Sequence, residues 1–152
     1  MDSKIDMDIL ADQLERHEGR RPLPYKDSVG VLTVGVGRNL ERPLSEDEID
    51  LMLSNDIKAA AKDAEKFLWF SGLDGIRQQV VVNMLFNLGW KRFTGFRKMI
   101  AAIEDRDWER AAVEMKDSKW YTQVGYRADE LIHMMRTGIQ NYRYRYKTGG
   151  GF

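Results

Sequence analysis

The sequence predicts an α+β protein that is mainly α-helical. Two runs of strand-forming residues flank the segment Asp27-Ser28-Val29-Gly30, which is typical of a type I turn in a hairpin. Much of the remaining chain carries apolar residues at helical spacing. With 152 residues, 43% of them hydrophobic and 32% charged, the chain is long enough for one globular domain or two closely packed lobes.

The first predicted helix covers residues 5–18, and Gly19 after it can adopt a left-handed cap conformation. Along the strand that follows the turn, side chains alternate between two faces. The face expected to lie in the core carries Leu32, Val34 and Val36. The opposite face carries Thr33, Gly35 and Gly37, so it offers one hydroxyl and two bare backbone positions on which a bulky ligand could lie.

Three polar side chains come together in this part of the sequence. Glu18 ends the helix, Asp27 opens the turn and Thr33 lies on the returning strand. Taken singly, each is more often a cap, turn or strand residue with a structural role. Together they suit glycoside hydrolysis, which needs one protonated carboxylic acid near the leaving oxygen and one ionised carboxylate for the water or the sugar cation.

These residues also carry a family resemblance. Glu-Gly at the helix end, Tyr25-Lys26-Asp27, and the run Leu-Thr-Val-Gly-Val-Gly at 32–37 resemble, in order and spacing, the catalytic motif of the phage-type lysozymes. These are the T4 lysozyme-like muramidases of glycoside hydrolase family 24. Later segments around Trp108, Trp120 and Arg127 are similar to the same family, so the resemblance extends from about residue 10 to residue 142.

The resemblance implies a single lysozyme-like domain over residues 1–152 with two lobes. A small catalytic lobe with a β-hairpin is expected at about 14–45, a connecting helix at about 46–67, and a larger helical lobe at about 68–146. The N-terminal helix 5–18 is expected to pack on the helical lobe. The connection before the long helix is shorter than in the best-known members, so we expect a reduced small lobe.

The resemblance also assigns roles to individual residues. Glu18 is expected to be the general acid, with Arg127 as a nearby cation. Asp27 and Thr33 are expected to hold a water on the opposite face of the sugar, the arrangement of an inverting enzyme. The residues expected to bind the glycan are Gly37, Asn39, Phe86, Asn87 and Arg127.

Several helix boundaries follow from local signals. Ser45 and Glu48 form a capping box before the long helix, and Asp74 is the expected cap of the next helix, which Gly89 ends. Further helices are expected at 96–103, from Asp107 to a close at 118–121, and at 126–138. Asn83 is expected to be a hydrogen-bonded core amide. The side chains expected to fill the core include Trp108, Trp120 and the methionines at 84, 99, 134 and 135.

Composition limits the other classes of function. The chain has no cysteine and two histidines, so we expect no disulfide, no metal site and no cofactor. No apolar run is long enough to cross a membrane, and no signal peptide is recognisable. The lack of a signal peptide and of cysteines fits a protein made in the host bacterial cytoplasm, which either acts on the periplasmic cell wall after release by another factor or is carried on a virion. We also expect a monomer.

Charge leaves two competing readings open. Residues 1–66 hold 10 Lys or Arg against 15 Asp or Glu, and the basic excess lies in residues 67–152. That excess suits an anionic wall polymer as partner, or is an accident of solvated helix faces. The resemblance implies that the function is hydrolysis of the β-1,4 bond between N-acetylmuramic acid and N-acetylglucosamine in peptidoglycan. The alternative is an inactive lysozyme-like domain that binds wall glycan or a protein, and a nucleic-acid partner is not expected.

Overall fold

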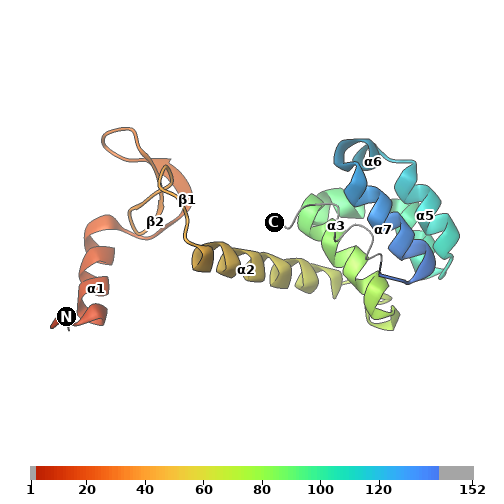
Figure 1. Cartoon of the computed structure of the whole chain (residues 1–152), viewed down its shortest axis with the longest axis horizontal. Coiled ribbons are helices and arrows are strands. Elements are labelled where there is room, and N and C mark those ends of the chain that lie inside the picture. Colours follow the sequence, from red (N-terminus) through yellow and green to blue (C-terminus); the bar gives the residue numbers. More distant parts are fainter. Residues whose placement is uncertain (1–2, 141–152) are drawn as a thin grey trace. The chain divides into compact units, whose positions relative to one another are not determined.

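The computed structural model describes residues 3–140, and the contacts within it divide the chain into two compact units. The first unit extends to Ile49 and the second begins at Asp50. The described residues form seven α-helices, one short 3-10 helix and one three-stranded antiparallel sheet (Figure 1). The mainly helical α+β fold that the sequence predicts is confirmed. The aromatic and basic residues 142–147 lie outside the described part.

The first unit begins with helix α1 (Met7–Glu18), which Asp6 caps by accepting hydrogen bonds from the amides of Asp8 and Ile9. Gly19 ends α1 with φ at +78°, but its ψ of 167° is extended, so the left-handed cap that the sequence predicted is wrong. The apolar residues Ile5, Met7, Ile9 and Leu14 are exposed. The packing of this helix on the helical lobe stays a prediction.

A sheet in the order β1-β2-β3 follows, and Figure 1 labels its first two strands. Strand β1 (Arg21–Lys26) pairs with β2 (Leu32–Gly35), and β2 pairs with β3 (Arg38–Asn39). The turn between β1 and β2 is the predicted one, because the amide of Gly30 donates to the carbonyl of Asp27 at 3.0 Å. The sequence predicted only a hairpin, since a two-residue strand such as β3 is too short to show an alternating pattern.

The predicted burial of β2 is wrong. Thr33 is the one buried residue among residues 3–49, with 4% of its surface exposed, whereas Leu32 and Val36 are 42% and 37% exposed. Thr33 lies on the central strand, between Tyr25 on β1 and Asn39 on β3, so neighbours on both sides cover its small side chain. Leu32 and Val36 lie at or beyond the ends of that short pairing, where less of the sheet covers them.

Helix α2 (Glu46–Ala64) begins with the predicted capping box. The amide of Ser45 donates to Oε2 of Glu48 at 2.8 Å, and the amide of Glu48 donates to Oγ of Ser45 at 3.2 Å. The two bonds satisfy amides that the start of the helix would otherwise leave unpaired. A 3-10 turn (Phe70–Gly72) follows α2 within the second unit.

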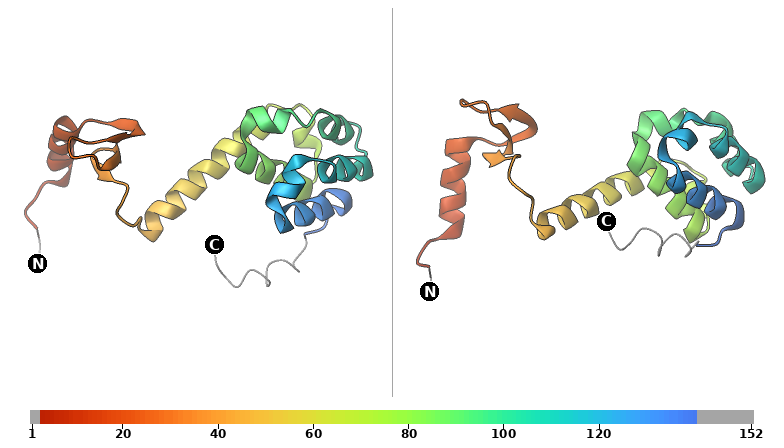
Figure 2. Two further views of the ribbon diagram at one scale, coloured as in Figure 1. Left: turned by 90° about the horizontal axis from the view of Figure 1, so that it is seen from above. Right: turned by 45° about the horizontal axis from the view of Figure 1, so that its top comes forward.

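The second unit contains five further helices, which pack on one another with α7 against α3, α5 and α6 (Figures 1 and 2). They are α3 (Gly75–Thr94), α4 (Arg97–Glu104), α5 (Trp108–Lys116), α6 (Lys119–Val124) and α7 (Tyr126–Thr137). The predicted caps Asp74 and Asp107 are confirmed, since each accepts a backbone N–H in the first turn of its helix. Gly89 breaks α3 with φ at +75°, but helix resumes after it up to Thr94.

One predicted helix end is wrong. The sequence predicted that residues 118–121 close the helix that starts at Asp107, but α5 ends at Lys116. Ser118 is extended (φ −143°, ψ 155°), and its hydroxyl accepts from the amide of Tyr121, so it caps a separate helix, α6. Ser118 lies two residues after the end of α5, so the sequence prediction merged the cap of α6 with the end of α5.

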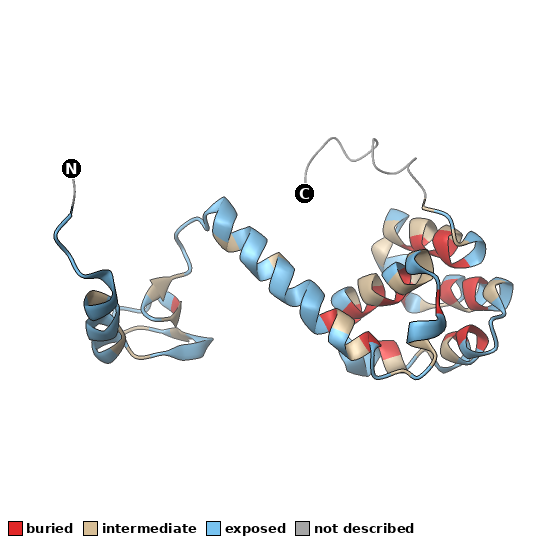
Figure 3. Cartoon of the chain, turned by 90° about the horizontal axis from the view of Figure 1, so that it is seen from below, coloured by how far each residue is buried: buried red, intermediate tan, exposed pale blue. Residues whose placement is uncertain are grey.

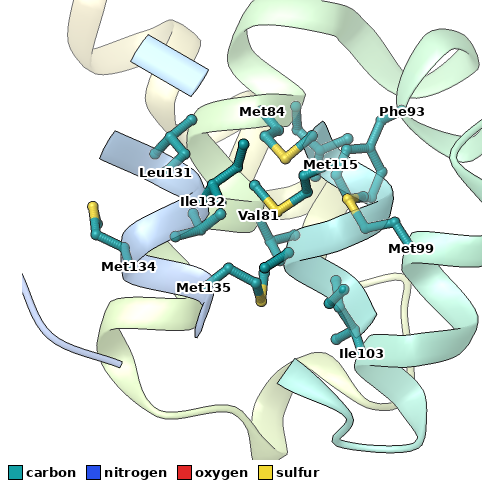
Figure 4. Close-up of a cluster of buried hydrophobic side chains, with 14 of the residues drawn as sticks. Val81, Met84, Phe93, Met99, Ile103, Met115, Leu131, Ile132, Met134 and Met135 are labelled. Atoms are coloured by element: carbon teal, nitrogen blue, oxygen red, sulfur yellow. The ribbon is translucent and has the colours of Figure 1, made fainter. Parts of the chain in front are cut away.

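The core of the second unit fills the space between these helices (Figures 3 and 4). Its largest fully buried side chains are Phe93, Ile103, Val80, Val81 and the methionines at 84, 99, 115, 134 and 135. Trp120 is also buried, and half-buried Trp108 packs against the core under the guanidinium of Arg77, 4.1 Å from its ring centre. The predicted core tryptophans and methionines are confirmed.

Candidate active site

Glu18 and Gly37 lie against each other in the first unit. Glu18 is the exposed last residue of α1, and Gly37 lies in the turn between β2 and β3 with φ at +64°. A Cβ atom added to Gly37 would be 2.9 Å from both Cδ and Oε2 of Glu18. The carboxyl group of Glu18 therefore rests on bare backbone, at a position where a side chain would displace it.

Asp27 is held by the turn that it opens. Its Oδ1 atom accepts hydrogen bonds from the amides of Val29 and Val31, both at 2.9 Å. Its own amide donates to the carbonyl of Val31 at 2.9 Å. These bonds fix the orientation of the carboxyl group, and neither of the side-chain bonds uses Oδ2. The turn role and a catalytic role are thus compatible in one side chain.

Thr33 is also held in place by a short-range bond. Its Oγ1 hydroxyl donates to the carbonyl of Val31 at 2.9 Å. A hydroxyl has one hydrogen, so Oγ1 keeps only acceptor capacity for any further partner. Asn39, the β3 neighbour of Thr33, accepts from the amide of Glu41 at 2.8 Å. Five of the site residues proposed from the sequence therefore lie in the first unit: Glu18, Asp27, Thr33, Gly37 and Asn39.

The remaining candidates lie in the second unit. Phe86 is 43% exposed and lines a groove of about 590 Å³ together with Asn83, Val82 and Arg127. This volume lies within the range of small-ligand sites. Asn87 accepts a hydrogen bond from Nε1 of Trp120 at 2.9 Å, so its side-chain carbonyl has a structural partner.

Arg127 is anchored by Asn83 across two helices. Its Nε and Nη2 atoms donate to Oδ1 of Asn83 at 2.9 and 2.7 Å, and Nη2 also donates to the backbone carbonyl of Asn83 at 3.1 Å. The prediction that Asn83 is a hydrogen-bonded amide is confirmed, but its predicted place in the core is wrong, because the residue is half-buried and lines the groove. Burial lowers the pKa of the Arg127 guanidinium, which still stays charged near neutral pH. Its service as a counter-charge to Glu18 stays a prediction.

Sequence reasoning missed several partners. Glu130 lies one turn after Arg127 on α7, and burial raises the pKa of its carboxyl. Arg38 on β3 forms an ion pair with Glu48 of the capping box. The hydrogen bond from Trp120 to Asn87 joins residues 33 positions apart. Of these features, only the capping box can be recognised from neighbouring residues in the sequence. The pairs Arg38 with Glu48 and Trp120 with Asn87 are distant in sequence, and no repeated spacing indicates them.

Two findings concern metal binding and membrane spanning in the described part of the chain. Among residues 3–140, no group of three or more histidine, aspartate or glutamate side chains is placed to hold a metal ion. No helix in that part is long and apolar enough to cross a membrane.

Comparison with known proteins decides the family. A family model described as phage lysozyme matches residues 15–136, from the last turn of α1 almost to the end of α7. The chain belongs to the phage lysozyme family. This confirms the resemblance that the motif at 18–37 carries. As a phage lysozyme, the protein is lysozyme-like, and its family suggests glycoside hydrolase activity.

Three relatives are similar over most of this phage lysozyme. "Probable T4-type lysozyme 1" and "Probable T4-type lysozyme 2" of Dictyostelium discoideum are 26% and 27% identical over 163 and 166 residues. These alignments cover 87% and 88% of this chain, and 96% and 98% of the relatives. The pre-baseplate central spike protein Gp5 of Enterobacteria phage T4 is 25% identical over 171 residues, covering 91% of this chain and 30% of that protein.

Proposed function

We propose that this phage lysozyme is a muramidase that hydrolyses the β-1,4 bond between N-acetylmuramic acid and N-acetylglucosamine in peptidoglycan. The observation that carries the proposal is the ordered set of Glu18, Asp27 and Thr33 in one unit, with the Glu18 carboxyl against bare backbone at Gly37. The bare backbone at Gly37 gives the carboxyl of Glu18 a place that a side chain would otherwise fill. The family match supports the same reaction class.

Glu18 acts in this proposal as the general acid. It donates its proton to the glycosidic oxygen as the bond to the sugar carbon breaks, and the leaving sugar departs as an alcohol. Because the carboxyl of Glu18 is exposed at the end of α1, a polymeric substrate can reach it, whereas it could not reach a buried carboxyl. Its contact with the turn at Gly37 limits where the carboxyl can lie.

In this proposal Asp27 and Thr33 hold the attacking water, which has to reach the Thr33 hydroxyl although that residue is only 4% exposed. The Thr33 hydroxyl already donates to Val31, so it can only accept a hydrogen from the water. Asp27 accepts the other hydrogen and acts as general base, which leaves an oxygen lone pair of the water directed at the sugar carbon. Because the water attacks opposite the leaving group, the configuration inverts and the product has the α configuration.

The residues of the second unit contribute to glycan binding in this proposal. Phe86 offers an exposed apolar face to a sugar ring. The carbonyl of Asn87 is used by Trp120, so its amide hydrogens are the groups that would donate to sugar hydroxyls. We also propose that the protein is made in the cytoplasm of a host bacterium and acts on the periplasmic wall after release.

The test is lysis by purified Glu18→Gln. An amide cannot donate the catalytic proton, so we expect the variant to lose nearly all lysis of chloroform-treated Gram-negative cells, measured as turbidity. Its melting temperature should be equal to or higher than that of the unmodified protein. The matched control is Glu15→Gln, which removes a carboxylate from the last turns of the same helix, where Glu15 pairs with Arg20. Substantial lysis by Glu18→Gln would remove Glu18 from its role.

A second measurement tests the stereochemistry. NMR of fresh digestion product, read before mutarotation, should show the α anomer first. A β product at early times would indicate an intermediate on Asp27, and the water-holding role of Thr33 would have to be abandoned.

The alternative function is glycan binding without hydrolysis. The observation that favours it is the short connection between β3 and α2, which has six residues and contains neither helix nor strand. A pull-down on purified peptidoglycan separates the two functions. Retention on the wall with no lysis by the unmodified protein would favour the binding module.

A further inference from the structure

An ion pair joins β3 to the first turn of α2 within the first unit. Arg38 donates from Nη2 to Oε1 of Glu48, and each side chain is 34% exposed. The other oxygen of Glu48, Oε2, accepts the amide of Ser45 in the capping box. Glu48 therefore uses one oxygen for the helix start and the other for the strand. The hydrogen bond from Ser45, helped by Arg38, holds the pKa of this carboxyl below its ordinary value.

Strand β3 needs such an anchor because it is short and lies at an edge. It has two residues, and it pairs on one side only, through Thr33 with Asn39 and Val34 with Arg38. One more backbone bond, from the amide of Leu40 to the carbonyl of Leu32, continues the pairing at 2.9 Å. Two-residue edge strands have few ladder bonds, so side-chain contacts decide how firmly they are held.

The neighbours of Arg38 are both candidate site residues. Gly37 precedes it and supports the carboxyl of Glu18. Asn39 follows it and lies opposite Thr33. A movement of Arg38 along or away from the sheet therefore moves the backbone on which the acid rests and the backbone that covers the threonine. Among the described side-chain contacts, the ion pair with Glu48 is the one that links strand β3 (Arg38–Asn39) to a helix.

We propose that the Arg38–Glu48 ion pair is a positioning device of the active site, which fixes β3 and thereby the carboxyl of Glu18 and the hydroxyl of Thr33. This inference rests on the proposed hydrolase function. Neither residue touches substrate in the proposal. Each acts through Gly37 and Asn39, whose backbone positions set the geometry of the reacting groups.

The capping box allows a variant that separates this role from helix stability. In Glu48→Gln the side-chain oxygen can still accept the amide of Ser45, because glutamine serves in capping boxes as glutamate does. The other end of the amide is an NH2 group, which cannot accept from Arg38. Glu48→Gln thus keeps the cap and removes the pair. The matched control is Glu46→Gln, since Glu46 lies in the same turn and takes part in none of the ion pairs found in residues 3–140.

Variants of the partner complete the set. Arg38→Met keeps most of the side-chain length without charge, and Arg38→Lys keeps the charge with a single ammonium group. For Glu48→Gln and for Arg38→Met we expect kcat on soluble peptidoglycan fragments to fall about tenfold, since displacement of reacting groups by a fraction of an ångström carries that order of cost. Arg38→Lys should recover most of the loss, and Glu46→Gln should match the unmodified protein.

The double variant and NMR decide whether the effect is positional. Arg38→Met combined with Glu48→Gln should lose no more activity than either alone, because both remove the same contact. Backbone amide signals of Thr33, Gly37 and Asn39 should shift in each single variant and stay in place in Glu46→Gln. The melting temperature should change little.

Two results would overturn the inference. One is an unchanged kcat and unchanged amide signals in Glu48→Gln. The other is a loss of activity that only follows the unfolded fraction of the protein. If the unmodified protein itself shows no hydrolysis, the proposed function fails, and the amide signals alone then decide whether the pair positions β3.

Discussion

Gly37→Ala is the sharpest test of how the backbone supports the catalytic acid. Gly37 has φ at +64°, a conformation that costs an alanine about 1–2 kcal/mol. The new Cβ would also lie 2.9 Å from Cδ and Oε2 of Glu18. Ordinary contacts between such atoms are about 3.5–4.0 Å, so the carboxyl would have to move by roughly 0.6–1.1 Å. The atoms that must move form the far end of a flexible side chain, so the displacement itself adds little to the loss of stability.

The effect on activity should be much larger than the effect on stability. A displacement of about 1 Å in a reacting group can cost on the order of 100-fold in rate. The control is Gly35→Ala, because Gly35 has a nearly equal φ of +66° and an added Cβ there meets nothing within 4 Å. Both variants should lose similar free energy of unfolding in urea, and Gly37→Ala alone should lose about 100-fold in lysis rate. Equal activity in the two variants would refute the reasoning.

Three further predictions concern Thr33, Asn83 and Glu130. Thr33→Val loses the bond to the carbonyl of Val31 and should cost about 1 kcal/mol in urea unfolding and most of the lysis, while Thr33→Ser should keep both. Asn83→Ala removes the two hydrogen bonds that Oδ1 of Asn83 accepts from the guanidinium of Arg127, keeps the bond to the backbone carbonyl, and should cost about 1.5–3 kcal/mol in the same assay. Burial raises the pKa of the Glu130 carboxyl in the folded protein above its ordinary value of 4.5. The stability that the protonated carboxyl contributes is therefore fully present below pH 4.5, and it is lost as the pH rises through the raised pKa. Glu130→Gln should therefore be more stable than the unmodified protein near neutral pH, and urea unfolding below pH 4.5 should show that advantage shrinking; an equal advantage at both pH values would contradict the assignment.

Local signals in the sequence were enough for most helix starts and for the turn. Ser45 with Glu48, Asp74 and Asp107 each cap a helix through bonds to amides three residues away, so their effect can be predicted from spacing alone. The turn at Asp27 is equally local. The candidate catalytic set could be proposed for the same reason, because its members lie within 16 residues of one another in the chain.

Burial in the sheet could not be predicted in this way. Alternation along β2 indicates two faces but does not indicate which one is covered, and the cover over Thr33 comes from Tyr25 and Asn39 on the two neighbouring strands. The second of these strands is too short to be recognised. The pairs Asn83 with Arg127 and Arg38 with Glu48 likewise depend on how elements pack, which propensity and spacing do not specify.

The methionines of the core give the second unit a chemical reporter of its own opening. Met84, Met99, Met115, Met134 and Met135 are at most 1% exposed, whereas Met7 and Met52 are 69% and 49% exposed. A peroxide converts accessible thioethers to polar sulfoxides, which an apolar interior cannot accommodate without loss of packing. Met7 and Met52 should therefore be oxidised in the native protein at the rate of a free thioether. Oxidation of the five buried sulfur atoms should require transient unfolding. The rate at which mass spectrometry detects sulfoxide in their peptides would therefore measure how often the core of the second unit opens.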